Sequence, residues 1–126
     1  MKRVKTVKVR SLREVLKARE PLESDIQVAV AEYLAYRGFR VYRRNVAGLL
    51  PMKKGGAMRV GETGQADLYG RQASTGRALE VEVKRPGEYP SPAQTAWLEC
   101  ALDDNVIAFW CDSVKGAEAC LKAFGI

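Results

Sequence analysis

Histidine is absent from this chain of 126 residues. Its absence excludes Ser-His-Asp and Cys-His nucleophilic catalysis, a histidine general base and zinc held by imidazole. The only cysteines are Cys100, Cys111 and Cys120, without a CxxC pair, so we expect reduced and mostly packed thiols. Neither a GxxxxGK[ST] phosphate loop nor a GxGxxG dinucleotide fingerprint occurs. Any catalysis must therefore depend on carboxylates, lysines and a hard metal ion.

Long apolar segments are also missing. No run approaches the roughly 18–20 apolar residues that a membrane span needs. The N-terminal segment MKRVKTVKVR is basic, but it lacks the apolar stretch and the small-residue cleavage site of a signal peptide. These absences predict a cytoplasmic protein without a membrane partner, and the length allows one hydrophobic core.

Positive charge is concentrated at the N-terminus. The chain contains 21 Lys and Arg against 15 Asp and Glu, a formal net charge of +6. Residues 1–20 hold eight of the basic residues and two acidic ones, so this arm carries the whole excess. A basic arm is typical of proteins that bind phosphate groups, because each neutralised phosphate releases counterions. The alternative is a solvated tail that aids solubility. We therefore divide the chain into a basic arm, 1–20, and a domain, 21–126.

Periodicity and turn residues predict seven elements in the domain. They are a helix after Pro21, strands at 39–46, 65–70 and 77–84, a helix capped by Ser91, a strand at 106–111 and a helix at about 114–124. The basic, glycine-rich segment 47–64 is predicted to be a long loop. The order α-β-β-β-α-β-α predicts an α/β fold with a mixed four-stranded sheet flanked by helices. Within it, the strand–helix–strand unit 77–111 should hold two parallel strands.

The first predicted helix has two possible starting points. Ser24 and Gln27 match a capping box, whereas Pro21 could open the helix earlier. Gly38 is a natural C-terminal stop.

The most informative segment is Leu79–Lys84, with the sequence LEVEVK. A strand places Glu80, Glu82 and Lys84 on one face and the three apolar residues on the other. Charged groups on a strand between helices are costly unless they serve one another or a ligand. An exposed cross-strand charge ladder is the equally weighted alternative.

Asp67 favours the ligand interpretation. It lies on the preceding predicted strand, and a hairpin between 65–70 and 77–84 could bring it beside Glu82. Two carboxylates from neighbouring strands, together with a backbone carbonyl, form an all-oxygen site suited to Mg²⁺ or Mn²⁺. A turn or edge-strand aspartate without a ligand is the alternative.

These residues together resemble a known family. An acidic residue on a first helix, G-x-x-D at 64–67, E-V-K-R-P at 82–86 and a glutamine on the next helix are similar to the PD-(D/E)xK nucleases. More narrowly, they resemble the VRR-Nuc (virus-type replication–repair nuclease) domains of phage proteins and Fanconi-associated nucleases. The resemblance covers about residues 21–111 and implies a restriction-endonuclease-like core. Ala66 stands where the family often has proline.

The resemblance implies a role for each motif residue. Asp67, Glu82 and the carbonyl of Val83 would bind Mg²⁺ or Mn²⁺. Lys84 would position or deprotonate the attacking water and help to neutralise the charge that develops on the phosphate.

Two further residues have competing interpretations. Glu23 would complete the metal shell, and its place on a row with Gln27 at one end of a core-facing stripe suits a buried site; plain capping of the first helical turn is the alternative. Gln94 would correspond to the family's glutamine, but with Ser91 it also forms a capping box.

The resemblance predicts a metal-dependent DNA endonuclease in a bacterial or phage-infected cell. Stand-alone members of the branch resemble Holliday-junction resolvases, so we expect a homodimer that acts on branched or junction DNA. The basic residues available to hold the DNA backbone are Arg43, Arg44, Lys53, Lys54, Arg59 and Arg85. No residue is predicted to contact a base, so no sequence specificity is predicted.

A non-catalytic nucleic-acid-binding module of a replication or repair system is the alternative function. Intact Asp67, Glu82 and Lys84 argue against it, because a protein that only binds DNA gains nothing from carboxylates near phosphate.

Overall fold

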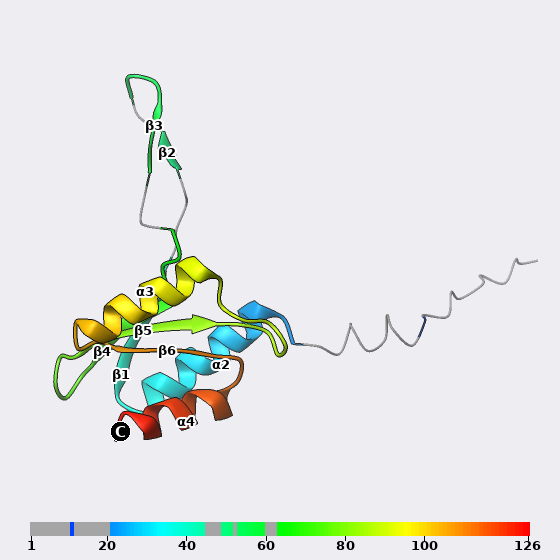
Figure 1. Ribbon diagram of the computed structural model, residues 1–126, viewed down its shortest axis with the longest axis vertical. Coiled ribbons are helices and arrows are strands. Elements are labelled where there is room, and N and C mark those ends of the chain that lie inside the picture. The colour runs from blue at the N-terminus through cyan, green and yellow to red at the C-terminus, as the bar shows by residue number, and fades with distance from the viewer. Residues whose placement is uncertain (1–10, 12–20, 45–48, 52, 60–62) are drawn as a thin grey trace, which may run out of the picture.

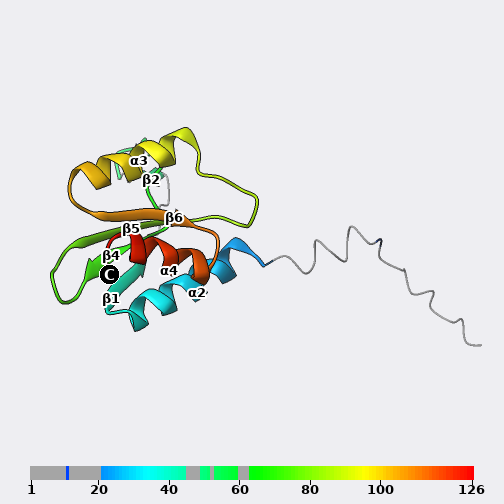
Figure 2. The ribbon, with the colours of Figure 1, turned by 60° about the horizontal axis from the view of Figure 1, so that its bottom comes forward.

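The protein is described by a computed structural model that covers residues 11, 21–44, 49–51, 53–59 and 63–126. Its domain consists of α2 (Glu23–Tyr36), β1 (Phe39–Arg43), β4 (Leu68–Gln72), β5 (Ala78–Val83), α3 (Pro92–Asp103), β6 (Ile107–Cys111) and α4 (Val114–Ala123), with a separate hairpin of β2 (Leu49–Pro51) and β3 (Ala57–Arg59). Helices α2 and α4 cover one face of the sheet, and α3 packs against β5 and β6 on the other (Figures 1 and 2). The predicted α/β class and the order of the seven elements are confirmed.

The main sheet has four strands in the order β1–β4–β5–β6. The pairs β1–β4 and β4–β5 are antiparallel, whereas β5 and β6 are parallel and are joined through α3. The sheet is therefore mixed, and the strand–helix–strand unit predicted for 77–111 is present.

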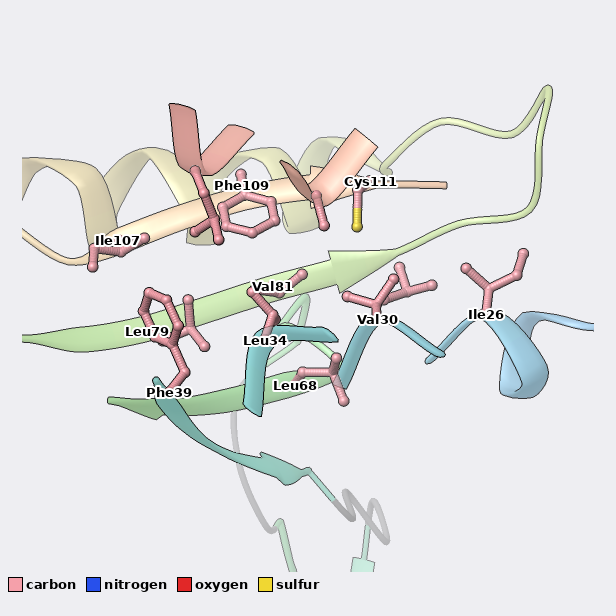
Figure 3. Close-up of a cluster of buried hydrophobic side chains, with 13 residues drawn as sticks. Ile26, Val30, Leu34, Phe39, Leu68, Leu79, Val81, Ile107, Phe109 and Cys111 are labelled. Atoms are coloured by element: carbon pink, nitrogen blue, oxygen red, sulfur yellow. The ribbon is translucent and has the colours of Figure 1, made fainter. Parts of the chain in front are cut away.

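Strand β5 separates the two faces of the sheet. Leu79, Val81 and Val83 are buried against α2 and α4, where Figure 3 shows Leu79 and Val81 beside Val30 and Leu34. The alternate residues of β5 lie on the opposite face of the sheet, against which α3 packs. A smaller apolar cluster of alanines and Leu98 lies on that face. The alternation predicted for this strand is confirmed. The larger cluster, on the face of α2 and α4, forms the main core.

Helix α2 begins at Glu23, ahead of the start that the capping box predicted. Its N-cap is Leu22, which makes no side-chain capping bond, so the capping box of Ser24 and Gln27 is wrong. Gln27 is instead buried, because its position falls on the inward side of the helix with the core residues. The predicted stop is confirmed: Gly38 follows the C-cap with φ +91° and bonds back to the last turn.

The segment 47–64 differs from the predicted loop. Strands β2 and β3 pair antiparallel within it, and Gly55 and Gly56, with φ of +83° and +80°, lie in the connecting turn. The glycines that suggested a loop thus form the turn of a hairpin. The following strand, predicted at 65–70, starts later, at Leu68.

Two further predictions concern the N-terminal arm and the absence of a membrane-spanning helix. The basic arm, 1–20, lies outside the described residues apart from position 11. Among the described helices, none has the length and apolar character needed to cross a bilayer.

Candidate metal centre

Three carboxylates from three separate elements meet at one end of the sheet. They belong to Glu23 in the first turn of α2, Asp67 immediately before β4 and Glu82 in β5, and one ligand atom of each lies within 4.8 Å of the others. The pairing of Leu68 with Val81 sets the register that places Asp67 next to Glu82. The predicted hairpin therefore does bring these two residues together.

A backbone contact holds Asp67 in this position. The amide N–H of Val83 donates a hydrogen bond to Asp67 Oδ2 at 3.0 Å. The aspartate thereby bonds to the main chain of the strand that carries Glu82. Val83 was predicted to contribute its carbonyl as a metal ligand; the structure shows the role of its amide, and the carbonyl ligand stays a prediction.

Glu82 is the most buried charged residue of the described chain, with 1% of its surface exposed. Its Oε1 accepts a hydrogen bond from Gln94 Nε2 at 2.9 Å and lies 3.5 Å from Lys84 Nζ. No described residue donates a hydrogen bond to its buried Oε2. An unpaired buried oxygen is costly, so this atom suits a proton or a cation.

The local electrostatics lead to the same conclusion. Burial, followed by the negative charge of Asp67 and by the hydrogen bond that a protonated Glu82 can donate to Asp67, raises the pKa of Glu82 from its ordinary 4.5 to about 8, although Lys84 acts in the opposite direction. Two neighbouring carboxylates in a dry site cannot both ionise cheaply. A divalent cation would remove this penalty, because it would neutralise both charges at once.

Gln94 performs both of the roles that the sequence left open. Ser91 Oγ accepts from the Gln94 N–H at 3.2 Å, and Gln94 Oε1 accepts from the Ser91 N–H at 2.8 Å, which completes the predicted capping box of α3. The amide nitrogen of the same side chain remains to bind Glu82. Because its oxygen is held by the cap, the orientation of the amide is fixed, and the glutamine acts as a positioning residue for the glutamate.

Lys84 follows β5 directly and stays in line with the sheet. Its backbone N–H donates to the carbonyl of Cys111 at 3.0 Å, which extends the pairing of β5 and β6 by one residue. The ammonium group is thereby kept on the same side as Glu82, as the alternation predicted.

Gln27 is a candidate that sequence reasoning assigned to another role. Only 6% of its surface is exposed, and its Oε1 is buried without a hydrogen-bond partner. It lies one helical turn after Glu23, on the same row of α2. The sequence showed this spacing of four, which placed Gln27 on the row of Glu23, beside the competing match to a capping box with Ser24. An amide oxygen is a ligand type that Mg²⁺ and Mn²⁺ accept, directly or through water.

Gly64 explains part of the G-x-x-D spacing. Its φ is +86°, and a Cβ at this position would lie 2.5 Å from the backbone carbon and oxygen of Ala93. The chain before Asp67 therefore packs directly against the first turn of α3. Ala66, where the family often has proline, is 1% exposed in the smaller cluster beneath that helix.

Arg44 forms a structural network beside the carboxylates. Its guanidinium forms two hydrogen bonds with the Glu80 carboxylate, at 2.7 and 2.9 Å, and a third with the carbonyl of Ala66 at 2.9 Å. It also stacks over the ring of Tyr69, with 4.6 Å between the guanidinium carbon and the ring centroid. Arg44 thus neutralises Glu80 and fixes the residue before Asp67, and its contact with phosphate stays a prediction.

The other basic residues predicted to bind DNA belong to β1, to the β2–β3 hairpin and to the segment after β5. Arg43 is exposed at the end of β1, and Lys53 and Lys54 are exposed in the turn of the β2–β3 hairpin, which projects from the domain in Figure 1. Arg85 is partly buried beside Lys84, and the side chain of Arg59 lies outside the described part. Their contacts with phosphate stay a prediction.

Comparison with protein-family models and with curated proteins gives no match. The likeness to the VRR-Nuc branch therefore rests on the motif residues themselves, and the chemistry of the centre has to be argued from its geometry.

Proposed function

We propose that this protein is a divalent-metal-dependent DNA endonuclease, which hydrolyses phosphodiester bonds at the centre formed by Glu23, Asp67 and Glu82. The observation that carries the proposal is the buried Oε2 of Glu82, to which no described residue donates a hydrogen bond and which lies in a group of three carboxylates. A protein that only binds DNA has no use for a buried carboxylate that lies within reach of two others.

The donor set fits Mg²⁺ or Mn²⁺. All three candidate ligands are carboxylate oxygens, and neither sulfur nor imidazole belongs to the group. Hard divalent cations prefer such oxygens and keep several waters for the substrate. When bound, the ion would polarise the scissile phosphate and make a coordinated water more acidic.

The residues around the cluster supply the other functions that hydrolysis needs. The ammonium of Lys84 lies 3.5 Å from Glu82 Oε1, where it can donate to a water and face the negative charge that builds on the phosphate. Gln94 and the amide of Val83 each bind one carboxylate, so that the ligands are oriented before substrate arrives. Arg44 keeps the neighbouring Glu80 neutralised.

Substrate binding is proposed from charge and from the motif resemblance. The net charge of +6, carried by residues 1–20, and the exposed lysines at 53 and 54 favour a polyanion. Action on branched DNA such as Holliday junctions by a homodimer rests on the resemblance, since two symmetric incisions at a four-way junction need two catalytic centres.

A metal-titrated cleavage assay tests the proposal. Wild-type protein, Asp67→Asn and Glu82→Gln are incubated with junction, flap and linear duplex DNA in Mg²⁺, in Mn²⁺ and in chelator. We expect cleavage only with metal, fastest on the junction, and a loss of about 100-fold or more in both variants. Glu118→Gln, an exposed substitution on α4, is the matched control. Cleavage in chelator, or wild-type rates in Glu82→Gln, would contradict the assignment. DNA binding without cleavage under any metal would favour the binding module.

A further inference from the structure

Among the described elements, only α3 packs on one of the two faces of the main sheet, and it covers half of that face. Helix α3 packs on β6 and β5, while the β1–β4 half of the same face carries exposed polar and aromatic side chains. By strand alternation from the buried Phe39 and Leu68, this half presents Arg40, Tyr42, Tyr69 and Arg71. All four are exposed, the two tyrosines by 47% and 39%. We call these four residues the Arg–Tyr surface.

The register of β1 and β4 places residues of the same type opposite each other on this surface. Arg40 lies directly opposite Arg71, and Tyr42 lies directly opposite Tyr69, with 5.6 Å between the ring centroids. Two cations at paired positions repel each other. Within the described part of the chain, neither guanidinium forms an ion pair or hydrogen bond, in contrast to Arg44, which Glu80 neutralises. An anion between the two arginines would relieve this repulsion.

The Arg–Tyr surface is continuous with the metal centre. Asp67, Tyr69 and Arg71 alternate along one strand, so that the tyrosine lies roughly 7 Å along the backbone from the aspartate. Arg44 links the two regions, because it stacks on Tyr69 and bonds to the carbonyl of Ala66. With Arg44 over Tyr69, Tyr42 is the more exposed ring of the pair.

We propose that the Arg–Tyr surface binds an unpaired DNA strand beside the metal centre, with a base stacked on Tyr42 and a phosphate between Arg40 and Arg71. An aromatic ring accepts any base, and arginine neutralises the backbone, so the binding is independent of sequence. A duplex keeps its bases stacked on one another and cannot offer them to the tyrosine. That this strand is part of the substrate rests on the proposed endonuclease function. That the Arg–Tyr surface binds it does not depend on that function.

Fluorescence anisotropy with full-length protein in chelator tests the inference without cleavage. The probes are a labelled oligothymidylate and a labelled duplex of equal length, so that the electrostatic contribution of residues 1–20 enters both measurements. We expect Tyr42→Ala to weaken binding of the single strand about 5-fold to 100-fold and to leave duplex binding unchanged. Tyr42→Trp should retain single-strand binding. Tyr36→Ala, at the most exposed tyrosine (86%) on α2, is the matched control and should bind both probes as wild type does.

The salt dependence provides a second readout. Arg40→Gln should lower the slope of log K against log salt for the single strand by about 0.7, the value for one lost phosphate contact. Single-strand binding by Tyr42→Ala equal to that of Tyr36→Ala would overturn the inference, and so would equal losses for single strand and duplex. If wild type cleaves DNA and Tyr42→Ala binds normally, only this inference fails. If Tyr42→Ala loses single-strand binding but no metal supports cleavage, only the proposed function fails.

Discussion

Replacing Glu82 by glutamine should stabilise the metal-free protein at alkaline pH. The amide keeps the shape of the side chain and can still accept from Gln94, but it carries no charge into the buried site. In the wild type, burial and the charge of Asp67 raise the pKa of Glu82 from 4.5 to about 8. Between these two values the folded protein holds a proton that the unfolded chain has released.

The sign and size of the effect follow from this difference in bound protons. Because the folded state binds more protons, the free energy of unfolding falls as pH rises, by up to about 1.4 kcal/mol per pH unit for one proton. From pH 5 to pH 8 the loss amounts to a few kcal/mol, on the order of 4. The contribution is fully present below the unfolded pKa and is lost once the pH passes the folded one. The free energy of unfolding of Glu82→Gln should not fall with pH in this way, because the glutamine has no proton to release.

Urea denaturation in chelator, followed by circular dichroism at half-unit pH steps, measures the difference. The gap in the free energy of unfolding between Glu82→Gln and wild type should open steadily with pH and level off above pH 8. Glu118→Gln on α4 should run parallel to wild type throughout. A constant gap for Glu82→Gln, or one that narrows as pH rises, would refute the reasoning about the buried carboxylate.

Four other changes have distinct expected outcomes. Lys84→Met should abolish cleavage but leave Mn²⁺ binding by calorimetry intact, because the ammonium is beside the ligands and is not one of them; loss of Mn²⁺ binding would argue against this. Arg44→Ala should lower the free energy of unfolding by about 2–4 kcal/mol in urea, since it leaves Glu80 unpaired; a neutral result would make the ion pair dispensable. Gly64→Ala should cost about 1–3 kcal/mol by the same assay and weaken Mn²⁺ binding, because its Cβ would meet the α3 backbone; an unchanged protein would contradict the close packing. Deleting residues 1–20 should flatten the salt dependence of duplex binding by about 0.9 per lost phosphate contact, with turnover at saturating DNA unchanged; monomers with an unchanged slope would instead make the arm a dimerisation element.

Sequence patterns of a few residues predicted those parts of the fold whose structure depends on neighbouring residues in the chain. Strand β5 alternates apolar and charged residues because its two faces meet different surroundings, and the alternation alone indicated which side Glu82 takes. Ser91, Pro92 and Gln94 form the start of α3 through contacts within four residues, so the pattern was sufficient.

Other features depend on contacts that no short window contains. The strands of the β2–β3 hairpin have three residues each, too few for a periodic signal. Gln27 matched a capping box locally, yet its burial in the tertiary fold decided its role. Arg44 was indistinguishable from its basic neighbours, because its partner Glu80 lies 36 residues away in the chain.

Calorimetric titration of the protein with Mn²⁺ at pH 7 tests the central claim, that Glu23, Asp67 and Glu82 form a divalent-cation site. Since burial and Asp67 raise the pKa of Glu82 to about 8, we expect metal binding to expel a proton, and repeating the titration in buffers of different ionisation enthalpy counts the protons released. The account predicts saturable binding by the wild type with release of about one proton, and loss of both signals in Glu82→Gln. Absence of Mn²⁺ binding by the wild type, or binding that Glu82→Gln leaves unchanged, would contradict it.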